Sequence, residues 1–101
     1  MSGLSITIDP EHTAARRYIL QGRIGSEESN ILQHELLEAE RGGCSHLVIN
    51  MRQVTFLSSA GIRVLLMFFK RAKGSGSFHI EDPSDNVTNV LGITALREMI
   101  T

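Results

Sequence analysis

The chain has 101 residues, of which 42% are hydrophobic, and its formal net charge at pH 7 is −1. This length suits one domain with one hydrophobic core, and the composition excludes disordered and fibrous chains. Acidic and basic residues are interspersed, which excludes the clustered basic surface that nucleic-acid binding needs. No apolar run approaches the ~20 residues of a membrane span, and Met1–Ile8 lacks the features of a secretory signal. We therefore expect a single cytoplasmic domain, residues 1–101, without nucleic-acid or membrane partners.

The first part of the chain is predicted to form two antiparallel strands. Apolar and polar side chains alternate through residues 4–9 with the period of two that marks a half-buried strand. Residues 10–13, Pro-Glu-His-Thr, supply a turn. The apolar run Tyr18–Leu20 then predicts a second strand, paired with the first.

A helix is predicted next, with Ser26 as its N-cap and the pair Gly42-Gly43 as its end. The two glutamates after Ser26 fit a helix start, because the positive end of the helix dipole stabilises carboxylates there. One apolar face is formed by residues spaced at i, i+4 and i+7, namely Leu32, Leu36 and Ala39.

Strands and helices alternate through the rest of the chain. The apolar run Leu47–Ile49 lacks polar alternation, which is typical of a buried strand. The expected elements are a strand at 46–51, a link at 52–57, a helix from Ile62 to about Lys73, a strand at 77–81, a short helix capped by Ser84 and ended by Gly92, and a last helix at 95–100. The order β-β-α-β-α-β-α-α predicts one α/β domain with a mixed, mostly parallel sheet covered by helices.

The helix that starts near Ile62 is apolar on more than one side. The stripe predicted to face the core is Ile62, Leu65, Leu66 and Phe69. Val64, Met67 and Phe68 would then lie largely away from it. We expect a neighbouring helix to cover Phe68, whereas Val64 and Met67 are candidates for a partner-binding surface.

Residues that could carry chemistry are few and scattered. The four histidines, His12, His34, His46 and His79, have no metal-ligand spacing. Phosphate-binding glycine motifs and the Gly-x-Ser-x-Gly nucleophile motif are absent. The single cysteine, Cys44, precedes an apolar run and is expected to be a buried structural thiol. The sequence therefore predicts no enzyme, no metal site and no cofactor.

Ser58 and Ser59 stand side by side before the predicted second helix. A serine at this place can cap the helix by accepting from the amides of its first turn. The same amides and the helix dipole favour an anion, so a phosphate on a serine here would be tolerated by the fold. Both interpretations stay open, because neighbouring serines can divide the roles of cap and acceptor.

The segment from His46 to Asp82 resembles the central part of STAS domains, specifically of bacterial anti-sigma factor antagonists. In that family a buried strand ends in Asn or Asp, an aromatic residue follows, and then Asp-Ser-Ser/Thr-Gly precedes Leu or Ile. The matching residues are Asn50, Phe56, Gly61 and Ile62. The similarity extends to "GRIGSEES" at the first helix and to "VTNVLGITAL" near the C-terminus, so it covers nearly the whole chain.

The resemblance implies a phosphorylation switch. Such antagonists bind an anti-sigma factor that is also a serine kinase, and thereby free the sigma factor. The kinase phosphorylates a motif serine, and a phosphoserine phosphatase reverses the modification. Counted back from Gly61, the acceptor is Ser59. Ser58 stands where many members have aspartate, which makes it an alternative acceptor, and Ala60 replaces the second hydroxyl of the motif.

The function implied is that of an anti-sigma factor antagonist, switched off by phosphorylation of Ser59. The predicted partner-binding residues are Ser58, Ser59, Ala60, Arg63, Val64 and Met67. One alternative is a non-switching STAS scaffold or transporter-accessory subunit, in which the serines only cap. Another is a nucleotide or small-molecule binder that uses the helix start as an anion site.

Overall fold

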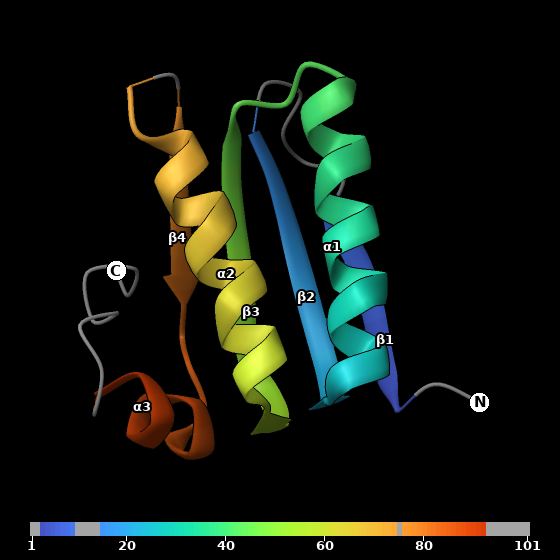
Figure 1. The fold of residues 1–101 in the computed structure, drawn as a ribbon, viewed down its shortest axis with the longest axis vertical. Helices are drawn as coiled ribbons and strands as arrows, with labels where there is room; N and C mark the ends of the chain where they lie inside the picture. The colour runs from blue at the N-terminus through green and yellow to red at the C-terminus, as the bar shows by residue number, and fades with distance from the viewer. Residues whose placement is uncertain (1–2, 10–14, 75, 93–101) are drawn as a thin grey trace.

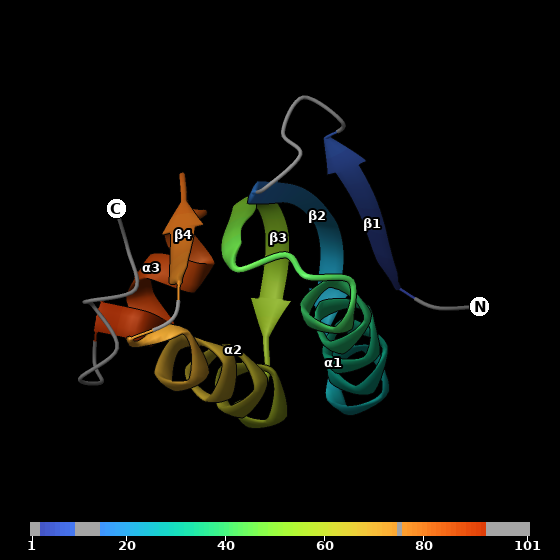
Figure 2. The ribbon, with the colours of Figure 1, turned by 90° about the horizontal axis from the view of Figure 1, so that it is seen from above.

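The computed structural model describes residues 3–9, 15–74 and 76–92, which form a four-stranded sheet with two long helices against one face (Figures 1 and 2). The elements, in chain order, are β1 (Leu4–Asp9), β2 (Ala15–Ile24), α1 (Ser26–Arg41), β3 (His46–Leu57), α2 (Ser59–Ala72), β4 (Ser77–Glu81) and α3 (Asp85–Gly92). Among the residues described, no helix has the length and apolar composition needed to cross a bilayer.

The strands lie in the order β1-β2-β3-β4. β1 pairs antiparallel with β2, which confirms the predicted pair, and β2, β3 and β4 are mutually parallel. The predicted α/β fold with a mixed, mostly parallel sheet is therefore confirmed. The predicted turn at 10–13 and last helix at 95–100 lie outside the described residues.

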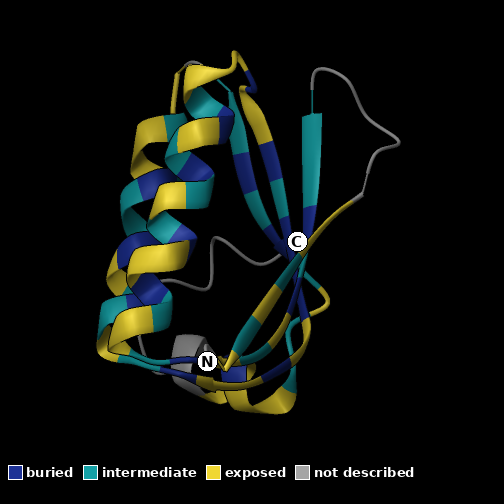
Figure 3. Ribbon diagram, turned by 90° about the vertical axis from the view of Figure 1, so that its right-hand side faces the viewer, coloured by how far each residue is buried: buried dark blue, intermediate teal, exposed yellow. Residues whose placement is uncertain are grey.

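The hydrophobic core lies between the sheet and the helices α1 and α2. The predicted apolar face of α1 is confirmed, since its members have no exposed surface: Leu32, Leu36 and Ala39. Tyr18 of β2 points from the sheet towards α1, and its hydroxyl donates to the Glu35 carbonyl of α1 at 3.5 Å. Figure 3 shows the buried positions concentrated where the two layers meet. Packing of this kind holds an amphipathic helix in place more firmly than its intrinsic propensity does.

The start of α1 differs from the prediction that Ser26 caps it. The N-cap is Gly25, and Ser26 is already the first helical residue. β2 extends to Ile24, so a single residue links strand to helix. The Glu28 carboxylate accepts from the Gly25 N–H at 2.9 Å, and a Cβ at position 25 would lie 2.7 Å from that carboxylate. The glycine therefore leaves room for a carboxylate that reaches back to the helix start.

β3 is twice as long as predicted, because the expected link at 52–57 continues the strand to Leu57. Val54 and Leu57 are buried on it, while the residues between them are exposed. β4 ends opposite Asn50, so the second half of β3 pairs only with β2. This half of β3 is exposed at most positions and carries polar residues there, so its sequence resembles that of a loop.

The short helix α3 lies against the second half of β3. The Ser84 hydroxyl accepts from the Val87 N–H at 3.3 Å and donates to the Val54 carbonyl at 2.6 Å. The prediction that Ser84 caps this helix is confirmed. The Asn86 amide also donates to the Thr55 carbonyl at 2.9 Å. These bonds take up strand carbonyls that β4 does not reach.

The core-facing stripe of α2 is not the predicted one. Its buried residues are Gly61, Val64, Leu65 and Phe68, and the expected members Ile62, Leu66 and Phe69 are only half-buried. The helix is apolar around much of its circumference, so two stripes that share Leu65 fit the 3.6-residue period. Phe68 and Val64, which were predicted to lie away from the core, belong to this buried stripe, with 2% and 7% of their surface exposed.

The sheet face away from α1 and α2 carries a polar cluster that joins three strands. Arg17 of β2 and Glu81 of β4 form an ion pair, with Arg17 Nε 3.1 Å from Glu81 Oε2. Asn50 of β3 lies between them and donates to Glu81 Oε1 at 3.1 Å. The hydrogen bond from Arg17 and that from Asn50 hold the pKa of the Glu81 carboxyl below its usual value. The charged form is thus favoured in the folded protein.

Replacing Glu81 with glutamine is expected to lower the free energy of unfolding at pH 7 by about 1 kcal/mol, since the pair is only partly buried. Because the folded pKa is depressed, the contribution of Glu81 is complete above its unfolded pKa and is lost as the pH falls through the folded pKa. Urea unfolding at about pH 7 and about pH 3 measures both effects.

The control for this experiment is Glu38→Gln, which removes the exposed pair between Glu38 and Arg41 on α1. Its expected effect is within about 0.5 kcal/mol. A Glu81→Gln protein with the same stability difference at both pH values would show that the charge of Glu81 is not what stabilises the cluster.

Candidate functional site

Ser58 joins the end of β3 to the start of α2 and is fixed on both sides. Its hydroxyl accepts from the Gly61 N–H at 3.1 Å, as an N-cap does. Its own N–H donates to the Ile24 carbonyl at the end of β2, at 2.9 Å. Ser58 is therefore the cap of α2.

Ser59 is the first residue of α2 and is exposed. Its hydroxyl has no hydrogen-bond partner within the part of the chain that the structure describes. The two serines thus have different environments. The Ser58 hydroxyl is hydrogen-bonded to the backbone, and the Ser59 hydroxyl is open to solvent.

The two serines are expected to differ in stability measurements. Ser58→Ala leaves the Gly61 N–H without its partner, so the free energy of unfolding should fall by about 1 kcal/mol. Ser59→Ala should change it by less than about 0.5 kcal/mol, because an exposed first-turn hydroxyl is replaced by a good helix former. Chemical denaturation of both variants tests this, and equal losses would contradict the assignment of the cap to Ser58.

Gly61 lies where the first turn of α2 touches the ends of two strands. A Cβ at this position would lie 2.7 Å from Leu57 Cδ1 and 2.9 Å from Ile24 Cγ2. Both of those side chains are buried. The absent side chain of Gly61 therefore allows the helix start to approach the strand ends closely.

A groove of about 230 Å³ separates the N-terminal halves of α1 and α2. It is lined by Ala60, Arg63, Val64 and Met67 of α2 and by Ser29, Asn30 and Gln33 of α1. Four of the six predicted partner-binding residues thus lie together, while Ser58 and Ser59 are at the helix start beside it. Of these four, Val64 offers little surface because it is buried. The three residues of α1 were not predicted, since their sequence carries no sign that α1 and α2 are neighbours.

A sequence profile of the STAS domain matches residues 9–101. The chain belongs to the STAS domain family. A search of curated proteins gave no significant match to this sequence.

Solved structures of anti-sigma factor antagonists have the same fold as this STAS domain. SpoIIAA in its unphosphorylated form gives a TM-score of 0.84 at 15% identity, over 96% of this chain and 86% of that chain. Bacillus SpoIIAA in the phosphorylated form gives 0.78 at 14% identity, over 96% and 89%. An antagonist from Mycobacterium paratuberculosis gives 0.83 at 16% identity, over 96% and 82%. At these identities the likeness shows the fold alone.

An exposed aromatic side chain lies on β3 just before the two serines. Phe56 is 39% exposed, and the Arg23 guanidinium of β2 stands 4.5 Å from the centre of its ring. The sequence motif includes Phe56, but the sequence does not indicate that its ring is exposed. The STAS domain therefore presents apolar and cationic surface next to Ser58, in addition to the groove.

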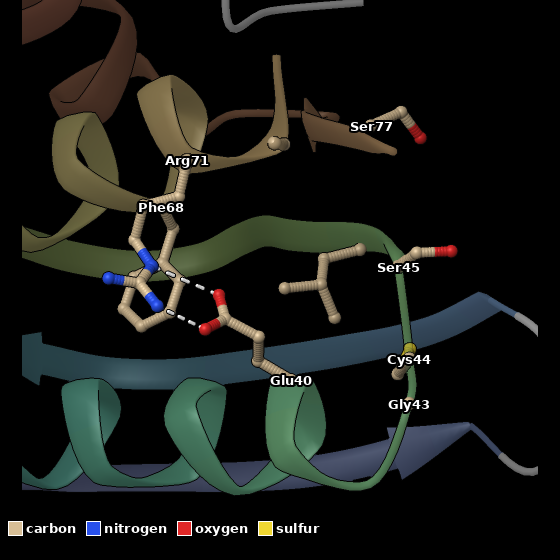
Figure 4. Close-up of a pocket in the computed structure, with 9 residues that line it drawn as sticks. Glu40, Gly43, Cys44, Ser45, Phe68, Arg71 and Ser77 are labelled. Atoms are coloured by element: carbon tan, nitrogen blue, oxygen red, sulfur yellow. Dashed lines mark hydrogen bonds and ion pairs between the residues drawn. The ribbon is translucent and has the colours of Figure 1, made fainter. Parts of the chain in front are cut away.

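A larger cavity, of about 490 Å³, lies at the other end of the two helices (Figure 4). Cys44 lines it and is buried, as predicted, with its thiol donating to the His46 carbonyl at 3.4 Å. Glu40 of α1 and Arg71 of α2 pair beside the cavity, with Arg71 Nε 3.0 Å from Glu40 Oε2. Hydrogen bonding from Arg71 lowers the pKa of the Glu40 carboxyl. This cavity is remote from the serines and includes none of the predicted site residues.

The described histidines lie apart from one another. His34 is on α1, His79 is on β4, and His46 at the start of β3 has Nδ1 2.9 Å from the Ser77 hydroxyl. Within the described ranges, no three histidine, cysteine, aspartate or glutamate side chains are grouped so that they could hold a metal ion. The fourth histidine, His12, lies outside the described residues.

Proposed function

We propose that this STAS domain is a cytoplasmic anti-sigma factor antagonist, which binds an anti-sigma factor serine kinase while Ser59 is unphosphorylated. Phosphorylation of Ser59 by that kinase releases the partner, and a phosphoserine phosphatase restores the binding form. The observation that carries the proposal is the difference between two adjacent hydroxyls. Ser58 is engaged as the cap of α2, and Ser59 is exposed beside the groove.

The structure also accounts for a departure from the family pattern. Serine and aspartate are both good N-caps, because each has a side-chain oxygen that accepts from the first turn. Ser58 occupies the place of the family aspartate and accepts from Gly61 N at 3.1 Å. The substitution therefore preserves the cap, and it leaves Ser59 as the hydroxyl available for modification.

Phosphorylation at this position would change the surface more than the fold. A phosphate carries close to two negative charges, and the first turn of a helix favours an anion. No acidic residue is present in the first turn of α2, so the phosphate would meet no like charge on its own turn. A partner that packs against this site would have to desolvate the phosphate or place its own surface against that charge. The affinity of the partner for the domain would therefore fall.

Phosphopeptide mapping after incubation with the cognate kinase and ATP tests the proposal. We expect one phosphate, on Ser59, in the wild type and in Ser58→Ala, and none in Ser59→Ala. Intact-mass measurement of protein from its native cells supplies a second check. A protein that never carries phosphate on Ser59 or Ser58 would contradict the switch and favour the non-switching scaffold or transporter-accessory role.

A further inference from the structure

We propose that Arg63 binds the phosphate on Ser59 within the same helix and in doing so leaves the groove between α1 and α2. This inference rests on the proposed phosphorylation of Ser59. It adds a residue that responds to the modification and extends the effect of the phosphate into the groove.

The spacing of the two residues allows the contact. Ser59 and Arg63 are at positions i and i+4 of α2, and both are exposed. Side chains with this spacing lie on the same helix face, with Cβ atoms about 5–6 Å apart. An anion placed N-terminal to a cation is the more favourable order of such a pair. The long arginine side chain therefore reaches the phosphate without a change in the backbone.

Arg63 is also available for a new partner. Arg17, Arg41 and Arg71 each pair with a glutamate, whereas Arg63 forms no ion pair or side-chain hydrogen bond with any residue that the structure describes. A planar guanidinium matches phosphate with two parallel hydrogen bonds, and such charge-assisted bonds are stronger than neutral ones. Phosphorylation thus gives Arg63 its first strong partner.

The groove changes as a result. Of the described residues that line it, only Arg63 is charged, and the others are Ser29, Asn30, Gln33, Ala60, Val64 and Met67. Before phosphorylation, Arg63 offers a cation to an acidic group of a partner seated in the groove. After phosphorylation the guanidinium is held at Ser59, and the groove is neutral. The modification therefore removes an attractive contact in addition to introducing a repulsive one.

The test installs phosphoserine at position 59 during synthesis of the full chain, so it needs no kinase. The second pKa of that phosphate is ordinarily about 6, and ³¹P NMR titration measures it. Arg63→Gln is expected to raise this pKa by about 0.4 relative to the unsubstituted phosphoprotein, because the pair favours the dianion. Arg63→Lys should give an intermediate value, since lysine keeps the charge but not the planar fork.

The matched control is Lys70→Gln, which also removes one positive charge from α2. Lys70 is exposed and lies eleven residues after Ser59, roughly 16 Å from it along the helix axis. It should move the phosphate pKa by less than about 0.1. Side-chain amide signals of Asn30 and Gln33 should shift on phosphorylation in the wild type and much less in the Arg63→Gln background.

Equal phosphate pKa values in Arg63→Gln and Lys70→Gln would overturn the inference. So would groove signals that shift equally with and without Arg63. Neither result bears on whether a kinase modifies Ser59, which the phosphopeptide mapping decides separately.

Discussion

Gly61→Val is expected to lower the free energy of unfolding by about 3 kcal/mol, the largest stability effect we predict for a single substitution in α2. Even a Cβ at this position would lie within 3 Å of Leu57 and Ile24 side-chain atoms. These atoms are in the core, so they have little room to move. Equilibrium unfolding in urea or guanidinium measures the loss.

Two further variants separate overpacking from helix propensity. Ala60→Val places the same side chain on the neighbouring residue, which faces the groove, and should cost only about 0.5 kcal/mol. Leu57→Ala removes the atom nearest to the position 61 Cβ, so Gly61→Val should be less harmful in that background than alone. Strictly additive losses for the Leu57 and Gly61 substitutions would contradict the close approach as the cause.

The second large effect concerns binding. Ser59→Asp should lower the affinity for the cognate anti-sigma factor kinase by roughly 100-fold, because a carboxylate in the proposed contact surface must be desolvated or left facing the partner. Ser59→Ala removes only a hydroxyl and should change affinity by less than about threefold. Titration calorimetry with the purified kinase and without ATP gives both values.

Lys70→Gln changes the net charge by the same amount as Ser59→Asp, at the far end of α2. Its affinity should stay close to that of the wild type, because its charge is remote from the site. If Ser59→Asp bound the kinase as tightly as the wild type, negative charge at position 59 would not be a release signal.

Much of the fold could be predicted because local patterns and packing agree. The spacing of Leu32, Leu36 and Ala39 identifies the buried face of α1, and the capping serine and glycine identify the bounds of α3. The stripe of α2 could not be predicted in this way, since its apolar residues fit two faces. The choice between them depends on the contact of Gly61 with Leu57 and Ile24, which come from other elements.

Only the part of the candidate site that lies on one element could be predicted from the sequence. Ser58 caps α2, and Ser59 and Arg63 lie in its first five residues, so the motif and the helical period locate the three together. The groove also needs Asn30 and Gln33 of α1. These are ordinary polar residues of a helix surface, and only the packing of α1 beside α2 gives them a place in the site.

The attachment of Ser58 has a consequence for how a kinase would recognise Ser59. Ser58 is bonded to Gly61 of α2 and to Ile24 of β2, so the residue after it is presented on a rigid helix. A kinase that accepts substrates only as extended chains would have to unwind the first turn of α2 and release both bonds. An enzyme that modifies Ser59 as proposed would therefore have to recognise a folded surface made by distant parts of the chain. A short peptide that contains the two serines would present Ser59 without that surface and should be a much poorer substrate than the folded domain.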